Sequence, residues 1–447
     1  MPTNTPGPSP TYTLTPTSIN ATGLPPVINT GKALEGAFNV NYTPTPLYVN
    51  TPRPPQSSDI YRAMKPAYEK GDWDEVIRLA NEIIKAEPEA ADIYYYMGEA
   101  YRFKGDPGSS ETAYSNALAL NSQFGAAYVG LARARLLADP NANVLPLLVE
   151  AVRLDPNFGE AFLERAKVKI RDNDVSGALQ DLGEANKLMP NSPLVFYYTA
   201  LAQQKQNVPD RALQAAEKSL TLDITYLPTY LLLGQLYAET GNDVEASRAL
   251  AVYLKYEEGD ASAYLLLGKM HFKKGEYEET IQQMDKALSL DRNRREANLY
   301  RFLSNVELGN ADESDRDIDQ VIANYSDRFD ASLGIIRGHY MNERYGSAEL
   351  TVSKTEALAK TDEQKALTYY WAALVYEKRN NPKKAVEYWK KLLELPEDAM
   401  TAEMRTEAEG RLAKLVTPTP TAKQGSKTAT PTRTPTPART PSKTPTK

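Results

Sequence analysis

A period of 34 residues constrains this chain more than any other feature of its sequence. From residue 57 to residue 362 the chain divides into nine pieces of 34 residues without an insertion, and each piece reads as two amphipathic helices separated by a turn. A single helix pair cannot bury its apolar face alone, so such pieces are expected to stack and share a core. The period therefore predicts one elongated all-α stack, although 447 residues would by length suggest two or three domains.

Glycine marks the turn between the two helices of a piece. Glycine adopts the left-handed backbone conformation that ends a helix, and the Asp or Asn that often follows it suits the start of the next helix. These glycines are Gly71, Gly105, Gly241, Gly275 and Gly309. Pro88, Pro156 and Pro190 then stop second helices, because proline cannot continue a helix, and so mark the boundaries between pieces.

Small residues alternate with large ones at fixed offsets inside each piece. The first helices carry Tyr94-x-x-Met97-Gly98-x-x-Tyr101 and its counterparts around Gly234 and Gly268, and the second helices carry matching alanines such as Ala178, Ala212 and Ala246. The glycine lets a neighbouring helix approach, and the aromatic side chains fill the remaining space. The pattern predicts that large side chains of one helix pack into gaps left by small residues of another.

This combination of offsets resembles the tetratricopeptide repeat family, whose pattern places an aromatic residue, Leu-Gly, Tyr, alanines flanking an aromatic residue, and proline at these positions. The resemblance covers about 340 residues and implies a right-handed superhelical solenoid of about ten helix-turn-helix repeats. The units begin at Ser57, Ala91, Gly125, Gly159, Pro193, Leu227, Ala261, Arg295, Phe329 and, after a slip of three residues, Ala366.

The resulting domain organisation has four parts. Residues 1–56 form a Pro/Thr-rich arm, residues 57–399 the solenoid, residues 400–416 a helix that caps the last repeat, and residues 417–447 a disordered Thr/Pro/Lys-rich tail. The eighth and ninth units depart from the pattern, because Phe302 and Ile336 replace the small residue and the ninth unit lacks the turn glycine. Local geometry is expected to deviate there.

Composition excludes several classes of function. The tail carries six Lys/Arg and no acid, and the first 56 residues have a net charge of +1. Because the whole chain has a net charge of −6, the residues between these two segments carry about −13. Such an acidic body speaks against nucleic acid as a partner. The absence of cysteine excludes disulfides and thiolate chemistry. No window is long and apolar enough to span a membrane, and the N-terminus lacks the features of a signal peptide.

The resemblance also implies a binding groove lined by the first helices. Two side chains of each unit, at its fifth and ninth positions, are expected to face that groove. The candidate binding residues are Tyr61, Lys65, Tyr95, Arg133, Lys167, Tyr197, Lys269, Arg337 and Tyr370. The basic members suit an acidic peptide or a carboxylate terminus, and exposed tyrosines suit an interface.

Structural interpretations stand beside these functional ones. The basic side chains could instead pair with neighbouring acids such as Glu69, Asp92, Glu160 and Asp330, and the tyrosines could pack in the core. The asparagines of the carboxylate-clamp chaperone adaptors of this family are missing, so chaperone binding is not carried over.

No enzymatic constellation emerges from the sequence, and neither a cofactor nor a metal site is expected. The only histidines, His271 and His339, fall at a repeat offset that packs in the core, and no glycine-rich phosphate loop or paired-histidine motif is present. We expect a protein that is not an enzyme.

The two ends of the chain suggest its setting. The Thr-Pro steps of residues 417–447 favour an extended spacer and resemble the stalks of bacterial surface proteins, which favours an extracytoplasmic location, whereas a true start at Met1 would favour the cytoplasm. Residues 19–49 are richer in apolar side chains than a spacer requires. They are either a flexible leader or an arm that docks in a groove of its own or of a neighbouring copy.

The sequence thus predicts a non-enzymatic scaffold that binds a protein or peptide in its groove. The alternative is a structural subunit that assembles into a filament or surface layer through its N-terminal arm.

Overall fold

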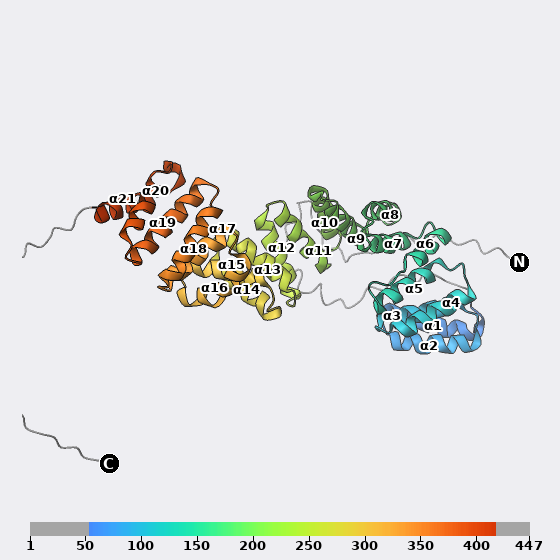
Figure 1. Ribbon diagram of the computed structural model, residues 1–447. Helices are drawn as coiled ribbons and strands as arrows, with labels where there is room; N and C mark the ends of the chain where they lie inside the picture. Colours follow the sequence, from blue (N-terminus) through green and yellow to red (C-terminus); the bar gives the residue numbers. More distant parts are fainter. Residues whose placement is uncertain (1–52, 417–447) are drawn as a thin grey trace, which may run out of the picture. The chain divides into compact units, whose positions relative to one another are not determined.

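The computed structural model describes residues 53–416, and in that range the chain is built from helices and short connections, with no strand (Figure 1). The prediction of an all-α fold is therefore confirmed for these residues. The expectations for residues 1–52 and for the tail, including a docking arm at residues 19–49, lie outside the described residues. None of the described helices is long and apolar enough to cross a bilayer.

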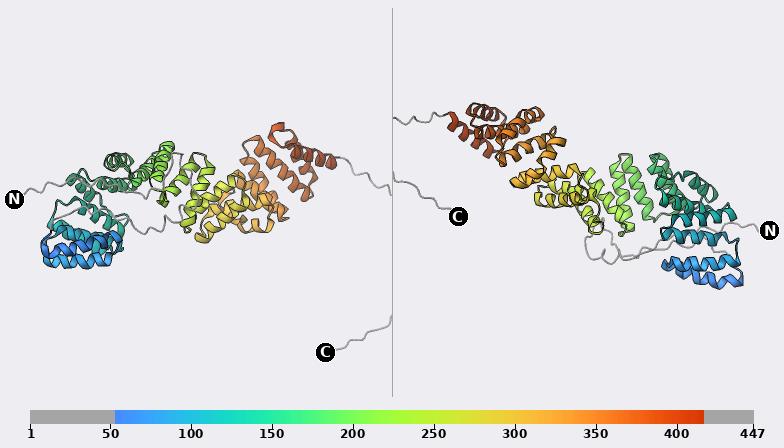
Figure 2. Two further views of the ribbon diagram at one scale, coloured as in Figure 1. Left: turned by 180° about the vertical axis from the view of Figure 1, so that it is seen from behind. Right: turned by 60° about the horizontal axis from the view of Figure 1, so that its bottom comes forward.

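The chain divides into two compact units after Asn324, between the eighth and ninth repeats. Unit one contains eight helix pairs, and consecutive helices lie side by side in both views of Figure 2. Its first helices are α1 (Pro55–Lys70), α3 (Ala91–Phe103), α5 (Gly125–Ala138), α7 (Gly159–Arg171), α9 (Pro193–Lys205), α11 (Leu227–Glu239), α13 (Ala261–Lys273) and α15 (Arg295–Leu308). Its second helices are α2 (Trp73–Ala86), α4 (Pro107–Leu120), α6 (Leu145–Leu154), α8 (Val175–Leu188), α10 (Pro209–Leu222), α12 (Asp243–Tyr256), α14 (Tyr277–Leu290) and α16 (Ala311–Tyr325).

Unit two contains two helix pairs and a final helix. These are α17 (Phe329–Met341), α18 (Tyr345–Leu358), α19 (Asp362–Lys378), α20 (Pro382–Leu393) and α21 (Ala402–Val416). The three extra residues before Ala366 lie within α19, because Thr361 and Gln364 form a reciprocal capping box that starts the helix at Asp362.

The core of each repeat depends on two positions, the eighth and the twenty-fourth, counted from the unit starts given above. A Cβ atom added to Gly98 would lie 2.7 Å from the Tyr114 ring, and one added to Gly234 would lie 2.7 Å from Leu250. Tyr114 and Leu250 both occupy position 24 of their repeats. The glycine therefore creates the space that the large side chain of the second helix fills.

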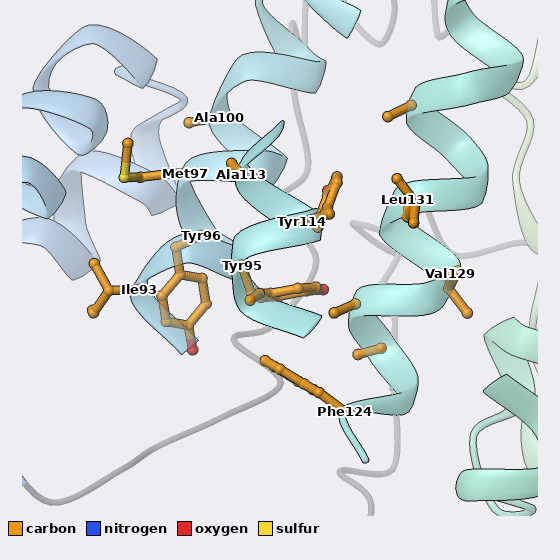
Figure 3. Close-up of a cluster of buried hydrophobic side chains, with 14 of the residues drawn as sticks. Ile93, Tyr95, Tyr96, Met97, Ala100, Ala113, Tyr114, Phe124, Val129 and Leu131 are labelled. Carbon is orange, nitrogen blue, oxygen red and sulfur yellow. The ribbon is translucent and has the colours of Figure 1, made fainter. Parts of the chain in front are cut away.

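Tyr114 also reaches the next repeat. A Cβ atom added to Gly130 of α5 would lie 2.2 Å from Cε1 of this ring. Figure 3 shows Tyr114 between α4 and the helix that carries Val129 and Leu131, with Tyr95 and Phe124 beside it. The ring centroids of Tyr95 and Tyr114 are 5.8 Å apart. One aromatic side chain thus joins the cores of the second and third repeats.

Three repeats have a large residue at position eight. The first repeat reverses the sizes, with Met64 at position eight and Ala80 at position 24. Ile336 and Val352 occupy the two positions in the ninth repeat, and both are fully buried. Phe302 is also fully buried in α15. The eighth and ninth repeats nevertheless each retain a helix pair, α15 with α16 and α17 with α18.

The predicted turn glycines all have the left-handed conformation, with φ between 72° and 79°. In four of the five repeats that lack this glycine, another residue takes the same conformation at the equivalent offset, whereas Asp139 of the third repeat is extended, with φ of −140°. The four left-handed residues are Asn173, Asn207, Glu343 and Asn380. The turn geometry is thus imposed by the repeat even where the local residue does not favour it, and Glu343 bears the largest penalty because it has neither the freedom of glycine nor the tolerance of asparagine.

Arg53 fastens the beginning of the described chain to the first repeat. Its guanidinium lies 3.0 Å from Glu87 Oε2, forms an ion pair with Asp92, and stands 4.9 Å above the centre of the Tyr61 ring. Its side chain is only 2% exposed. Arg53, two residues before the start of α1, therefore belongs to the folded solenoid.

Gly130→Ala is expected to lower the free energy of unfolding by about 1–3 kcal/mol, because the added methyl group would overlap a ring that is fully buried. Urea denaturation followed by circular dichroism measures this change. Gly183→Ala in α8 is the matched control, since its added Cβ meets no atom within 4 Å, and it should stabilise the protein by about 0.5–1 kcal/mol through helix propensity. Equal effects of the two substitutions would contradict the packing described here.

Glu343→Gly is expected to stabilise the protein by about 1 kcal/mol, because it removes the cost of a left-handed non-glycine residue without removing a described side-chain contact. Asn173→Gly should have a smaller effect, and Gly309→Ala should destabilise. Thermal unfolding of the three variants tests this order. A lower melting temperature for Glu343→Gly would refute it.

Candidate interaction face

Successive first helices contact one another and form a continuous surface, called here the first-helix face. In unit one these contacts run from α3 to α15, and in unit two they join α17 with α19. Among the described residues, no two second helices make contacts of comparable extent. The stack of each unit is therefore tighter on the side of the first helices, and this side is the inner one.

The fifth position of the repeats is more buried than the sequence suggests. Tyr61 is 5% exposed and Tyr95 is 9% exposed, so neither ring offers contact surface, which corrects their assignment as binding residues that face the groove. The reason is the close approach of neighbouring repeats. The Tyr61 ring, for example, lies 6.4 Å from the ring of Tyr96 in the next repeat.

Tyr197 and Tyr370 are only half-buried. Tyr197 packs edge-on against Tyr226, with ring centres 5.1 Å apart, and burial raises its pKa to about 12, so its hydroxyl stays neutral. Tyr370 donates a hydrogen bond from its hydroxyl to Glu407 Oε2 at 2.6 Å. Of the four predicted tyrosines, these two keep accessible surface.

The cations at the ninth position connect each repeat to the next one. Lys167 lies 5.4 Å from the centre of the Tyr198 ring, Lys269 lies 5.6 Å from that of Tyr300, and Arg337 lies 5.5 Å from that of Trp371. All three rings occupy position six of the following repeat. Cation–π contacts of this kind are attractive, so these predicted binding residues contribute to stacking between repeats.

Arg133, also at the ninth position, contacts the next repeat in the same way, but through carboxylates instead of a ring. Its guanidinium lies 3.0 Å from Glu164, at position six of the next repeat, and 2.8 Å from Glu160. The pairing with Glu160 is the one that the sequence left open as an alternative to ligand binding. Lys269 also pairs with Glu296 at 2.8 Å. Lys65 is half-buried and lies 5.5 Å from the ring centre of Tyr61 in its own helix.

A continuous line of charges results along repeats two to four. Buried Glu99 accepts hydrogen bonds from Arg102 and Tyr114, and Glu164 binds both Arg133 and Lys167. Burial acts to raise the pKa of Glu164, but Arg133 and Lys167 outweigh it and hold this pKa at about 2. These charges already satisfy one another, so this part of the face offers few open partners to a ligand.

The fifth and sixth repeats interrupt this line. Their fifth and ninth positions are occupied by Tyr197, Leu201, Leu231 and Gln235, which are all half-buried and form what we call the apolar stretch. One turn further, Gln204 Nε2 donates a hydrogen bond to Glu239 Oε1 at 2.8 Å, which connects α9 with α11. The apolar stretch is thus a partly exposed surface on two connected helices, with Lys167 before it and Lys269 after it.

Groups suited to catalysis do not converge in the described residues. His271 is half-buried and its Nδ1 lies 2.6 Å from Glu276 Oε2, so it forms a polar contact at the turn and is not the core residue that its offset predicted. His339 is buried, as its offset predicted. A polar pocket of about 650 Å³ is lined by Arg292, Asn293, Arg295, Asn298 and Gln320, which include no carboxylate and no histidine. No group of acids and histidines in residues 53–416 could hold a metal ion.

Two family models described as tetratricopeptide repeat match the chain, at residues 261–294 and 367–397. The first match coincides with the seventh unit. Repeats of this kind generally serve as scaffolds for protein–protein interaction and are typically not enzymes. No curated protein matches the sequence.

Solved structures with a similar arrangement share little sequence with the chain. YrrB, described as a TPR protein with an unusual peptide-binding site, is 19% identical with a TM-score of 0.36, over 42% of this chain and 96% of its own. MamA from Desulfovibrio magneticus RS-1 is 21% identical with a TM-score of 0.34, over 37% and 92%. A chain of the APC/C hetero-tetramer Cut9-Hcn1 is 13% identical with a TM-score of 0.40, over 81% of this chain and 84% of its own.

Glu164→Gln tests the charges on the face through their pH dependence. The folded pKa of about 2 lies below the ordinary value of 4.5, so the carboxylate stabilises the fold above pH 4.5, and this contribution is lost as the pH falls toward 2. We expect the wild type to lose on the order of 1–2 kcal/mol more than the variant between pH 6 and pH 3, measured by urea denaturation.

Glu184→Gln is the control for this measurement. Glu184 pairs with Lys187 on the exposed surface of α8, and exposed pairs contribute little, so its pH dependence should match that of the wild type. Parallel curves for wild type and Glu164→Gln would show that Arg133 and Lys167 do not stabilise the Glu164 carboxylate.

Proposed function

We propose that this tetratricopeptide-type solenoid is a scaffold that binds an extended peptide segment of a partner protein on the apolar stretch of its fifth and sixth repeats. The observation that carries the proposal is the change along the first-helix face. The cations of repeats three, four and seven are held by carboxylates and rings, whereas Leu201, Leu231 and Gln235 are half-exposed.

The chemistry of the apolar stretch defines the partner. Leucine and tyrosine side chains bind apolar and aromatic side chains, and Gln235 supplies an amide that bonds to a peptide backbone. Tyr197 is a favourable anchor, because its ring is held by Tyr198 and Tyr226 and loses little rotamer freedom on binding. The partner segment is therefore apolar at its centre, and an acidic segment fits the surface less well because the neighbouring cations are already engaged.

The test begins with 12-residue peptides selected on the full chain from a random display library. Leu201→Asp and Leu231→Asp are expected to weaken the selected peptides at least tenfold in fluorescence anisotropy, because each places a charge in the apolar contact. Leu290→Asp is the matched control, since this leucine is 46% exposed at the end of α14, a second helix, and it should leave the affinity unchanged. Peptides that bind all four proteins equally would exclude the apolar stretch as the site.

A further inference from the structure

Unit two carries a second surface, formed by aromatic side chains of its first helices and of the start of α18. Tyr340 of α17, Tyr345 of α18, and Tyr370 and Trp371 of α19 are half-buried. Trp371 lies 5.5 Å from Tyr340 and 5.8 Å from Tyr370, and Tyr340 lies 5.4 Å from Tyr345, all edge-on. We call these four residues the C-terminal aromatic patch.

Polar contacts hold the rings of this patch in place. Arg337 stands 5.5 Å above the Trp371 ring, and the Tyr370 hydroxyl is fixed by Glu407 of α21. Arg411, one turn further along α21, lies 2.8 Å from Glu407 and 2.9 Å from Glu377 of α19. The aromatic surface is therefore pre-organised, which lowers the entropy cost of binding.

Rigid aromatic rings set side by side suit one class of ligand, a proline-rich segment in the polyproline II conformation. Such a segment is already extended and loses little entropy on binding, and its proline rings stack against aromatic side chains. This chain contains such a segment. Residues 430–441, Thr-Pro-Thr-Arg-Thr-Pro-Thr-Pro-Ala-Arg-Thr-Pro, include Pro431, Pro435 and Pro437.

The tail starts close to the patch. Helix α21 ends at Val416, five residues after Arg411, which corresponds to about 8 Å along the helix. Residues 417–429 connect this point to the proline-rich segment and include Gly425 and Ser426. The root-mean-square span of a random-coil chain of 13 residues is about 20 Å. The segment can therefore return to α19 without strain.

We propose that residues 430–441 bind the C-terminal aromatic patch of their own chain, with prolines packed against Trp371 and Tyr340. The short connector gives the segment an effective concentration of about 1 mM at the patch, so even a contact with a dissociation constant of a few tenths of a millimolar is mostly formed. The tail thus occupies this surface and must leave before another proline-rich partner binds there. This surface is separate from the apolar stretch of repeats five and six, so the proposal stands independently of the peptide site proposed there.

The test compares the full chain with the full chain carrying Pro431→Ala, Pro435→Ala and Pro437→Ala. Acrylamide quenching of tryptophan fluorescence should increase in the triple variant, because Trp371 loses its cover, and Trp371→Phe should abolish the difference. A synthetic peptide of residues 430–441 should bind the triple variant about three- to fivefold more tightly than the wild type, since the tail of the wild type competes with it.

Three results would overturn the proposal. They are equal quenching of the two proteins, a peptide that leaves the fluorescence of the triple variant unchanged, and a difference present at 50 μM protein but absent at 1 μM, which would make a second copy the occupant. If Trp371→Phe reduces the helix content, Tyr345→Ala at the edge of the patch supplies the same control, and it should weaken the added peptide without changing the helix content.

Discussion

The pairing of positions eight and 24 within each repeat is the constraint on which the rest of this structure depends. Helices α3 and α4 approach closely because Gly98 leaves room for Tyr114, and α11 and α12 do so because Gly234 leaves room for Leu250. When the sizes change, as at Met64 with Ala80, the partner changes with them. In these repeats a small residue at one position is matched by a large one at the other, which lets the two helices pack closely.

Contacts between repeats follow a second rule, in which the side chain at position nine lies over position six of the next repeat. The rule tolerates different chemistry, since Arg133 meets a carboxylate and Lys167 meets a ring at the same place. Burying such groups is favourable only when they are paired. A side chain that is paired with the next repeat is not available to bind a ligand. Contacts that stabilise the stack and contacts that bind a partner therefore need the same helix face. The surface left for recognition lies where leucine and glutamine interrupt the rule.

The sequence predicts the repeat well because its signals are local. The turn glycines and the first residues of most first helices follow from a few neighbouring residues, and the capping box of Thr361 and Gln364 could have been read in the same way. The burial of Tyr61 and Tyr95 could not, because it depends on how closely the next repeat approaches. A further signal was present but unused. Arg165 binds Asp181 and Arg301 binds Asp317, each 16 residues apart at positions seven and 23, so opposite charges at these offsets indicate a pair.

The packing of Tyr114 restricts which repeat can follow the second one. This ring fills space in its own repeat and in the next one, where Gly130 at position six makes room for it. Most other repeats have Tyr, Leu or Glu at that position, as in Tyr96, Glu164 and Leu232. A repeat copied or exchanged during evolution would therefore fit behind the second repeat only if it brought a glycine at its sixth residue. The repeats share one fold, but the side chains at their contacts differ. Their order along the chain can therefore not be changed freely.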